Sequence, residues 1–244
     1  QTITSNQKTK ALAIVKSYFI PNGLKGTLTP SARTHALSQF SPIDLPNGFS
    51  FVIIIRSTGY FLFKKTEEEE PIKKSSTHLR FQVIDNTLHC IDIKSNGGNN
   101  SKYRKALHDN QNVTLSENEL NQYYLDEMED LFFDGQYTPK GSRPTLKEKS
   151  LRELALGRLT SEGFPNEFSF VLSINSGGGA KFVLGYPPLI PKRNSTLFFF
   201  RVENNQLTCD SIVSNRVNDH YYRKALFEAE QTTLSEAETK QYYL

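Results

Sequence analysis

The chain of 244 residues has no tryptophan, one methionine, two cysteines and no long apolar run. A membrane-spanning helix needs about 18 or more consecutive apolar residues, so the sequence predicts no membrane span. Two cysteines are too few for a disulfide-stabilised secreted scaffold and too far apart for a zinc site, so we expect neither a metal nor a cofactor. The net charge of +3 is too small to indicate nucleic-acid binding.

The sequence does contain an internal repeat. The segments "FSFV", "YRKAL", "TLSE" and "QYYL" each occur twice, and the two occurrences are always 119 residues apart. Repetition at a fixed offset is typical of duplicated structural units. Cys90 and Cys209 keep the same offset, so they occupy equivalent places in separate copies. We therefore expect two free, buried cysteines instead of a disulfide.

The repeat divides the chain into four predicted segments. They are an N-terminal helix over residues 1–22, a first copy over 23–125, a helical extension with a Gly/Pro-rich linker over 126–142, and a second copy over 143–244. The apolar residues of the first segment recur at helical spacing. We expect that helix to dock on the first copy.

Both copies have the same predicted order of elements. A helix (31–40; 150–159) precedes four strands (49–55, 60–63, 77–83 and 88–93; 168–174, 181–186, 196–202 and 207–212), and helical segments close each copy (102–110 and 114–124; 221–230 and 233–243). Thr114 and Thr233 resemble helix N-caps with an acidic residue three positions later. The pattern predicts an α+β fold, two tandem copies of a small antiparallel sheet with helices on either side.

Arg56 follows the most apolar predicted strand and precedes a tight turn, Ser57-Thr58-Gly59. A buried arginine is costly unless a carboxylate or an anionic ligand meets its charge. A strand-end arginine can also extend past a glycine turn into solvent. The turn offers hydroxyl and backbone N–H donors, which favours an anionic ligand.

The third predicted strand carries further positive charge. It has no acidic residue, and His78 and Arg80 are two positions apart, which places both side chains on one face. Guanidinium groups match phosphate oxygens in a bidentate manner. Together with Arg56, this spacing predicts a phosphate pocket, although His78 taken alone is typical of a surface strand.

The order of elements and these residues resemble the Src homology 2 domain, the phosphotyrosine-binding module. "IIIR", which ends at Arg56, is similar to the Phe-Leu-Val-Arg signature whose arginine holds the phosphate. His78 and Arg80 match the histidine and the basic residue two positions later in the third strand of that family. The family takes a further arginine from its first helix, where Arg33 is the candidate. The tryptophan usual near the start of the domain is absent.

The resemblance implies a non-enzymatic adaptor for a tyrosine-phosphorylated protein or peptide. The site residues that it implies are Arg33, Arg56, Ser57, Thr58, His78 and Arg80. Divergent tandem domains of this kind are similar to those of bacterial effectors. The resemblance therefore implies an intracellular protein, of a type that bacteria secrete into the host cytoplasm.

The second copy lacks the polar residues of this predicted site. At the offset of 119 it has Asn175 for Arg56, Leu197 for His78 and Phe199 for Arg80. The apolar frame is retained, which fits a functional first site and a degenerate second one. Arg33 is retained as Arg152, and a helix-surface salt bridge explains that pair equally well. Three loop cations of the second copy offer a different anion site or a solvated face: Lys181, Lys192 and Arg193.

Two other function classes compete with phosphotyrosine binding. A scaffold that holds a protein partner through its sheet faces or helices would bind regardless of phosphorylation. An enzyme would need a metal triad, a nucleophile with a base or a phosphate-binding loop, and none recurs in the two copies. "SGGGAK" in the second copy lacks the P-loop spacing and joins two strands, so we interpret it as a hairpin turn.

Overall fold

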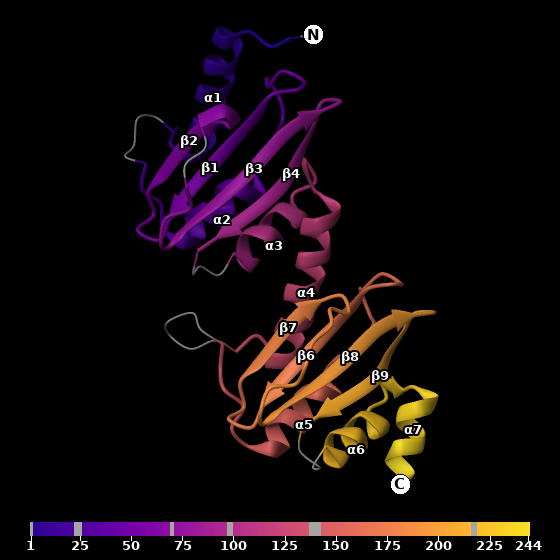
Figure 1. The fold of residues 1–244 in the computed structure, drawn as a ribbon. Coiled ribbons are helices and arrows are strands. Elements are labelled where there is room, and N and C mark those ends of the chain that lie inside the picture. The colour runs from indigo at the N-terminus through magenta and orange to yellow at the C-terminus, as the bar shows by residue number, and fades with distance from the viewer. Residues whose placement is uncertain (1, 22–25, 69–70, 97–99, 137–142, 216–218) are drawn as a thin grey trace. The chain divides into compact units, whose positions relative to one another are not determined.

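The computed structural model describes residues 2–21, 26–68, 71–96, 100–136, 143–215 and 219–244 (Figure 1). It divides the chain into two compact units, Gln1–Tyr123 and Tyr124–Leu244, and each unit has its own hydrophobic core. The expected boundary between residues 22 and 23 and residues 137–142 of the expected linker lie outside the described residues.

The first unit contains nine complete elements and the start of α4. In chain order they are α1 (Ser5–Phe19), α2 (Pro30–Ser38), β1 (Ser50–Arg56), β2 (Phe61–Lys65), the 3-10 helix η2 (Thr66–Glu68), β3 (Ser76–Ile84), β4 (Thr87–Ser95), α3 (Ser101–Asp109), β5 (Val113–Leu115) and α4 (Glu117–Phe133). Among its described residues, the second unit repeats this order without an equivalent of η2. After the end of α4 it contains α5 (Lys149–Gly157), β6 (Ser169–Asn175), β7 (Ala180–Leu184), β8 (Ser195–Glu203), β9 (Gln206–Ser214), α6 (His220–Glu228), β10 (Thr232–Leu234) and α7 (Glu236–Tyr243).

The predicted N-terminal helix is confirmed as α1. Thr4 caps it, because its hydroxyl accepts from the Gln7 backbone N–H while the Gln7 side chain accepts from the Thr4 N–H. Ala11, Val15 and Phe19 recur every four residues and are buried in the core of the first unit. This apolar stripe docks the helix on the first copy, as expected.

Each unit has a five-stranded mixed sheet, whereas an antiparallel sheet was expected. The strand orders are β2-β1-β3-β4-β5 and β10-β9-β8-β6-β7, and the first four strands of each unit pair antiparallel. The fifth strands, β5 and β10, run parallel to β4 and β9. Thr114 and Thr233 lie in these strands and are therefore not helix caps. Ser116 and Ser235 accept the capping hydrogen bonds instead, from Glu119 and Glu238 N–H groups.

The core helices of the first unit cover one face of its sheet, not both faces as predicted. Phe51, Ile53 and Ile55 of β1 share a core with residues of α1, α2 and α3. The alternate residues of β1, which include Val52 and Arg56, point to the opposite face. We call the opposite face the open face, and its equivalent in the second unit carries Leu197 and Phe199.

The β3–β4 and β8–β9 hairpins have two-residue turns. Asp85 and Asn86 have φ of 50° and 61°, and Asn204 and Asn205 have φ of 52° and 60°. Positive φ at both central residues is the type I′ geometry that matches strand twist, and Asn and Asp tolerate it. The turn fixes the register that carries His78 and Arg80.

The helical extension predicted after the first copy is present as α4. Its last residues are not a spacer, because Met128, Phe132 and Phe133 are fully buried in the core of the second unit. Phe132 contacts Phe182 with a ring-centroid distance of 5.5 Å. The segment expected as a linker therefore contributes part of the second core.

A buried ion pair ties the closing helices to each sheet. In the first unit Glu119 accepts from Arg104 Nε at 2.6 Å and from the Ile93 backbone N–H at 2.9 Å. In the second unit Glu238 accepts in the same way from Arg223 and Ile212, at 2.7 and 2.9 Å. The repeated "YRKAL" segments supply the two arginines, and each glutamate lies two residues after the repeated "TLSE" segment. The repeat therefore encodes a tertiary contact.

Within the described ranges, no helix has both the length and the apolar character needed to cross a membrane.

Candidate functional site

Arg56 is the last residue of β1, and the chain turns tightly behind it. The Gly59 N–H donates to the Arg56 carbonyl at 2.8 Å, and Gly59 has φ of 87°. A Cβ at this position would lie 2.4 Å from the Leu28 carbonyl oxygen, so only glycine fits. The turn is thereby held against the segment that leads into α2.

The Arg56 guanidinium has no internal counter-ion in the described part of the chain. Its side chain is half-buried, and its Nε is fully buried without a hydrogen-bond partner among those residues. A buried donor left unpaired costs about 1–3 kcal/mol. Among the described residues, the carboxylate pairing that would remove Arg56 as an anion site is therefore not found.

Arg33 has a different environment from Arg56. It is buried, and it donates from Nε to the Leu28 carbonyl at 3.0 Å, from Nη2 to the Ser57 carbonyl at 3.3 Å and from Nη1 to the Tyr103 hydroxyl at 3.4 Å. These bonds join α2, the turn after β1 and α3 on the helix-covered side. The helix-surface salt bridge considered for this residue is wrong, because all three partners are uncharged.

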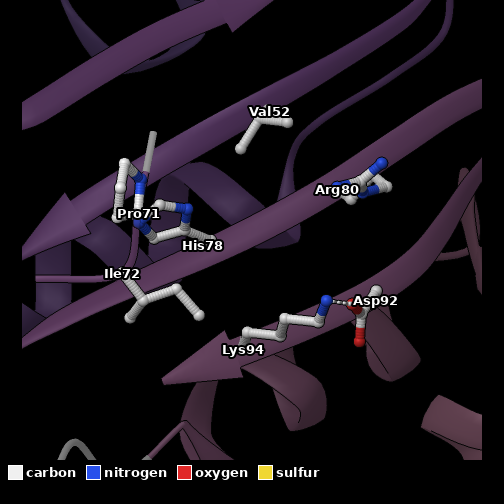
Figure 2. Close-up of a pocket in the computed structure, with 7 residues that line it drawn as sticks. All are labelled: Val52, Pro71, Ile72, His78, Arg80, Asp92 and Lys94. Atoms are coloured by element: carbon white, nitrogen blue, oxygen red, sulfur yellow. Dashed lines mark ion pairs between the residues drawn. The ribbon is translucent and has the colours of Figure 1, made fainter. Parts of the chain in front are cut away.

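His78 and Arg80 lie together on the open face, as the spacing predicted. They line a cavity of about 170 Å³ with Val52, Pro71 and Ile72, and Asp92 and Lys94 complete its described wall (Figure 2). In register, Val52 is opposite Arg80 and Ile54 is opposite His78. The cavity thus combines cations with apolar side chains.

The cavity also contains an acidic residue, which the sequence reasoning missed. Asp92 is opposite Arg80 in the β3–β4 register, and its carboxylate lies 3.3 Å from Lys94 Nζ (Figure 2). The alternation of "DIK" in β4 was the available signal, since two residues apart in a strand share a face. The neighbouring strand β4 therefore supplies both a carboxylate and a further cation.

The predicted site residues on the open face and its turn form two neighbouring groups. His78 and Arg80 line the cavity, and Arg56 lies beside it with the turn residues. Arg56 is opposite Ser76 in β3, so it shares the open face with His78 two positions later, but it does not line the cavity. Ser57 and Thr58 are exposed in the turn, and Arg33 reaches that turn from the helix-covered side. We call Arg56 with Ser57 and Thr58 the strand-end group.

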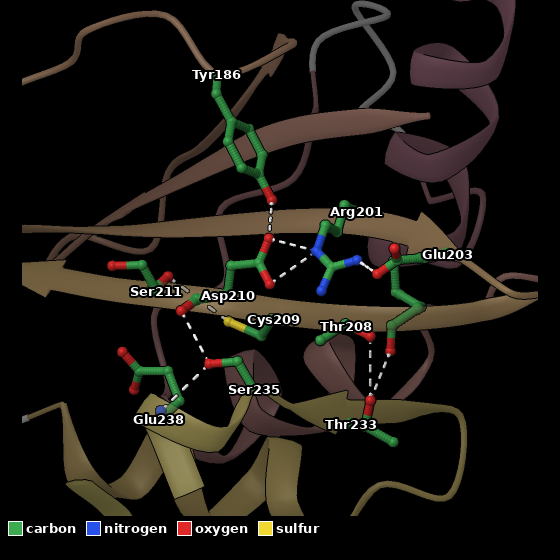
Figure 3. Close-up of polar contacts among 11 residues, drawn as sticks. Tyr186, Arg201, Glu203, Thr208, Cys209, Asp210, Ser211, Thr233, Ser235 and Glu238 are labelled. Carbon is green, nitrogen blue, oxygen red and sulfur yellow. Dashed lines mark hydrogen bonds and ion pairs between the residues drawn. The ribbon is translucent and has the colours of Figure 1, made fainter. Parts of the chain in front are cut away.

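In the second unit, apolar side chains take the places of His78 and Arg80 on the open face. Leu197 is buried, and Phe199 contacts Tyr186 edge-to-face with 5.4 Å between ring centroids. The Tyr186 hydroxyl donates to Asp210 at 2.8 Å, and Arg201 Nε donates to both oxygens of the same carboxylate (Figure 3). The chain's own tyrosine thus lies where the first unit has the wall of its cavity.

Both cysteines are free and completely buried, as predicted. Burial raises the pKa of the Cys90 and Cys209 thiols well above the usual range, because a thiolate is poorly solvated there. Among the described residues, no group of three or more His, Cys, Asp and Glu side chains is arranged to hold a metal ion. "SGGGAK" joins β6 to β7, which confirms the hairpin interpretation.

No protein-family model, curated protein or solved structure matches this chain significantly.

Proposed function

We propose that the first unit binds phosphotyrosine-bearing peptides, with Arg56 as the residue that holds the phosphate. The observation that carries this proposal is the buried Arg56 Nε, which has no partner in the described part of the chain. A phosphate oxygen would satisfy this donor and meet the charge of the guanidinium. In this proposal the exposed Ser57 and Thr58 hydroxyls add further donors.

The open-face cavity supports tyrosine as the phosphorylated residue. His78 and Arg80 share the face of Arg56, and Val52, Pro71 and Ile72 add apolar surface. An aromatic ring gains from contact with both, through burial of its carbon surface and through cation–π attraction to a guanidinium. A short phosphoserine side chain would leave this cavity empty.

The proposal is tested with fluorescent peptides that carry phosphotyrosine, tyrosine or phosphoserine in one sequence context. Each charged hydrogen bond contributes about 1.5–3 kcal/mol, so Arg56→Ala should weaken phosphotyrosine binding at least about tenfold. Arg56→Lys should retain part of the affinity, because it keeps the charge but loses the fork. Lys10→Ala, which removes an exposed cation of α1 in the same unit, is the control and should change nothing.

Full affinity of Arg56→Ala for the phosphotyrosine peptide would refute the assignment. Equal binding of the three peptides would favour the second candidate, a phosphorylation-independent scaffold. One observation supports that candidate. Leu154 is 61% exposed beside a groove of about 470 Å³ between α5 and α6, which Tyr221 also lines. A scaffold of this kind would retain its partner in Arg56→Ala.

A further inference from the structure

A polar cavity of about 250 Å³ lies at the end of the second sheet. We call it the sheet-end cavity. Lys149 and Arg152 of α5 line it together with Asn175 at the end of β6, Asn194 and Tyr222 of α6. Its described lining contains two cations and no carboxylate. A cavity with this composition favours a negatively charged occupant.

Arg152 is buried, and most of its N–H groups are bound to the protein. Nε donates to the Leu146 carbonyl at 2.8 Å, Nη2 to the Lys147 and Ser176 carbonyls at 2.7 and 3.0 Å, and Nη1 to the Tyr222 hydroxyl at 3.2 Å. A guanidinium has five N–H groups. One N–H at Nη1 and the proton of the Tyr222 hydroxyl are therefore left without an acceptor in the described part of the chain.

Two asparagines add one donor and one acceptor to this cavity. The Asn175 carboxamide oxygen accepts from the Gly179 N–H at 3.0 Å, which leaves its NH₂ group as a donor. The Asn194 carboxamide oxygen is buried and has no partner among the described residues. The unused groups are thus several donors, one lone acceptor and the positive charge of Arg152.

We infer that the sheet-end cavity of the second unit binds a phosphomonoester or free phosphate. The Arg152 Nη1, Tyr222 hydroxyl and Asn175 amide donate to its oxygens, and Lys149 adds positive charge at the wall. The second ionisation of a phosphate ester has a pKa near 6, so near that pH the ligand retains one P–OH group, which donates to the Asn194 oxygen. Sulfate and carboxylate have no such proton at pH 6. This site lies in the other unit from the proposed phosphotyrosine site and does not depend on Arg56.

The test is a titration of the ¹⁵N-labelled full chain at pH 6 with phenyl phosphate, inorganic phosphate and sulfate. Amide signals of residues 175–179 should shift saturably with both phosphates, with a dissociation constant on the order of 1 mM, and sulfate should bind several-fold more weakly. Tighter binding of phenyl phosphate than of phosphate would identify an ester, and the reverse would identify the free ion.

Two substitutions of the exposed Asn175 separate binding from folding. Asn175→Asp introduces a carboxylate that repels the anion and should weaken binding at least about tenfold. Asn175→Arg introduces the residue that the first unit has at the equivalent position, Arg56, and should strengthen phosphate binding about tenfold. Unchanged amide signals of β8 and β9 would show that both variants fold.

Absence of a saturable shift at residues 175–179, or a shift unaffected by Asn175→Asp, would overturn the inference. Equal binding of sulfate and phosphate would overturn the assignment to a phosphate. Arg56→Ala should leave these shifts unaltered, so failure of this site and failure of the phosphotyrosine proposal give different results.

Discussion

The two units have the same framework and different open faces. In each unit the helix before the first strand of the sheet, α2 or α5, carries a buried arginine that donates to backbone carbonyls and to a tyrosine hydroxyl. These pairs are Arg33 with Tyr103 and Arg152 with Tyr222. A glycine packs its turn against the segment before that helix, with φ of 87° at Gly59 and 89° at Gly178. The residues retained at the offset of 119 therefore hold helices, turn and sheet together.

The differences between the units cluster at the strand end and on the open face. The first unit has Arg56, His78 and Arg80 where the second has Asn175, Leu197 and Phe199. Folding alone does not require such differences, because the two cores are built alike. Residues that are the same in both units therefore form the shared framework. Equivalent positions with different residues mark where the surfaces of the two units differ in role.

The largest expected effect comes from breaking the shared framework. Glu119→Ala leaves the Arg104 charge buried without its carboxylate, since both residues are at most 6% exposed. Loss of one partner of a buried pair costs about 3–5 kcal/mol. Hydrogen exchange of β3 and β4 amides should speed up accordingly, and Glu238→Ala should have the same effect on β8 and β9.

Exposed acidic residues in the same helical turns are the controls for this prediction. Glu117→Ala and Glu236→Ala should change unfolding free energies by at most about 0.5 kcal/mol. A cost below about 1 kcal/mol for Glu119→Ala, or costs that differ strongly between the units, would contradict a common framework.

Most helices and strands could be predicted because the same residue pattern occurs in both copies. The third strand, expected over 77–83, is observed as Ser76–Ile84, and the expected helix over 102–110 is Ser101–Asp109. The shared offset also predicted free cysteines correctly, since a residue cannot meet its own counterpart in a separate core. These conclusions depend on local patterns and on the repeat alone.

The layer arrangement could not be predicted from the same patterns. Every residue from Phe51 to Ile55 is apolar, and a continuous apolar strand predicts cover on both faces. In the structure, helices cover one face, and Pro71 and Ile72 from the β2–β3 connection line the cavity on the other. The contact depends on the path of a loop, for which strand periodicity carries no information.

The candidate site was predicted in part for a similar reason. Alternation in β3 correctly placed His78 and Arg80 on one face, whereas the sequence left open whether Arg56 is buried or extends into solvent. The role of Arg33 was missed because its acceptors, the carbonyls of Leu28 and Ser57, meet only where Gly59 allows close approach. Backbone acceptors have no side-chain signature in a sequence.

A pH-dependent contribution is expected in the second unit. Burial, together with repulsion by Asp126 and Asp130, raises the pKa of Glu129 from 4.5 to about 7, although its ion pair with Arg143 opposes the shift. The folded state therefore binds a proton that the unfolded state releases between these values. Stability should fall as pH rises from about 4.5 to 7, by on the order of 2–3 kcal/mol.

Glu129→Gln tests this contribution, because it removes the titrating group. Relative to the wild type, the variant should gain stability at pH 8 compared with pH 5, as measured by denaturant unfolding followed through hydrogen exchange of β6 to β9. The β1 to β4 amides of the first unit are the internal control and should respond equally in both proteins. An identical pH profile for variant and wild type in the second unit would contradict the raised pKa.

The smallest expected effect concerns the tyrosine on the second open face. Tyr186→Phe keeps the ring on Phe199 and removes the hydroxyl that donates to Asp210, whose carboxylate stays paired with Arg201 (Figure 3). Loss of one hydrogen bond should cost about 0.5–1.5 kcal/mol.

The matched control for Tyr186→Phe is Tyr60→Phe in the first unit. The Tyr60 hydroxyl has no hydrogen-bond partner among the described residues, and its side chain is exposed, so its loss should have no measurable cost. Equal effects of the two substitutions on the free energy of unfolding would mean that the hydrogen bond from Tyr186 to Asp210 does not stabilise the second unit. A clear difference would show that the Tyr186 hydroxyl stabilises the second unit through Asp210, next to Phe199, the residue that replaces Arg80 of the first unit.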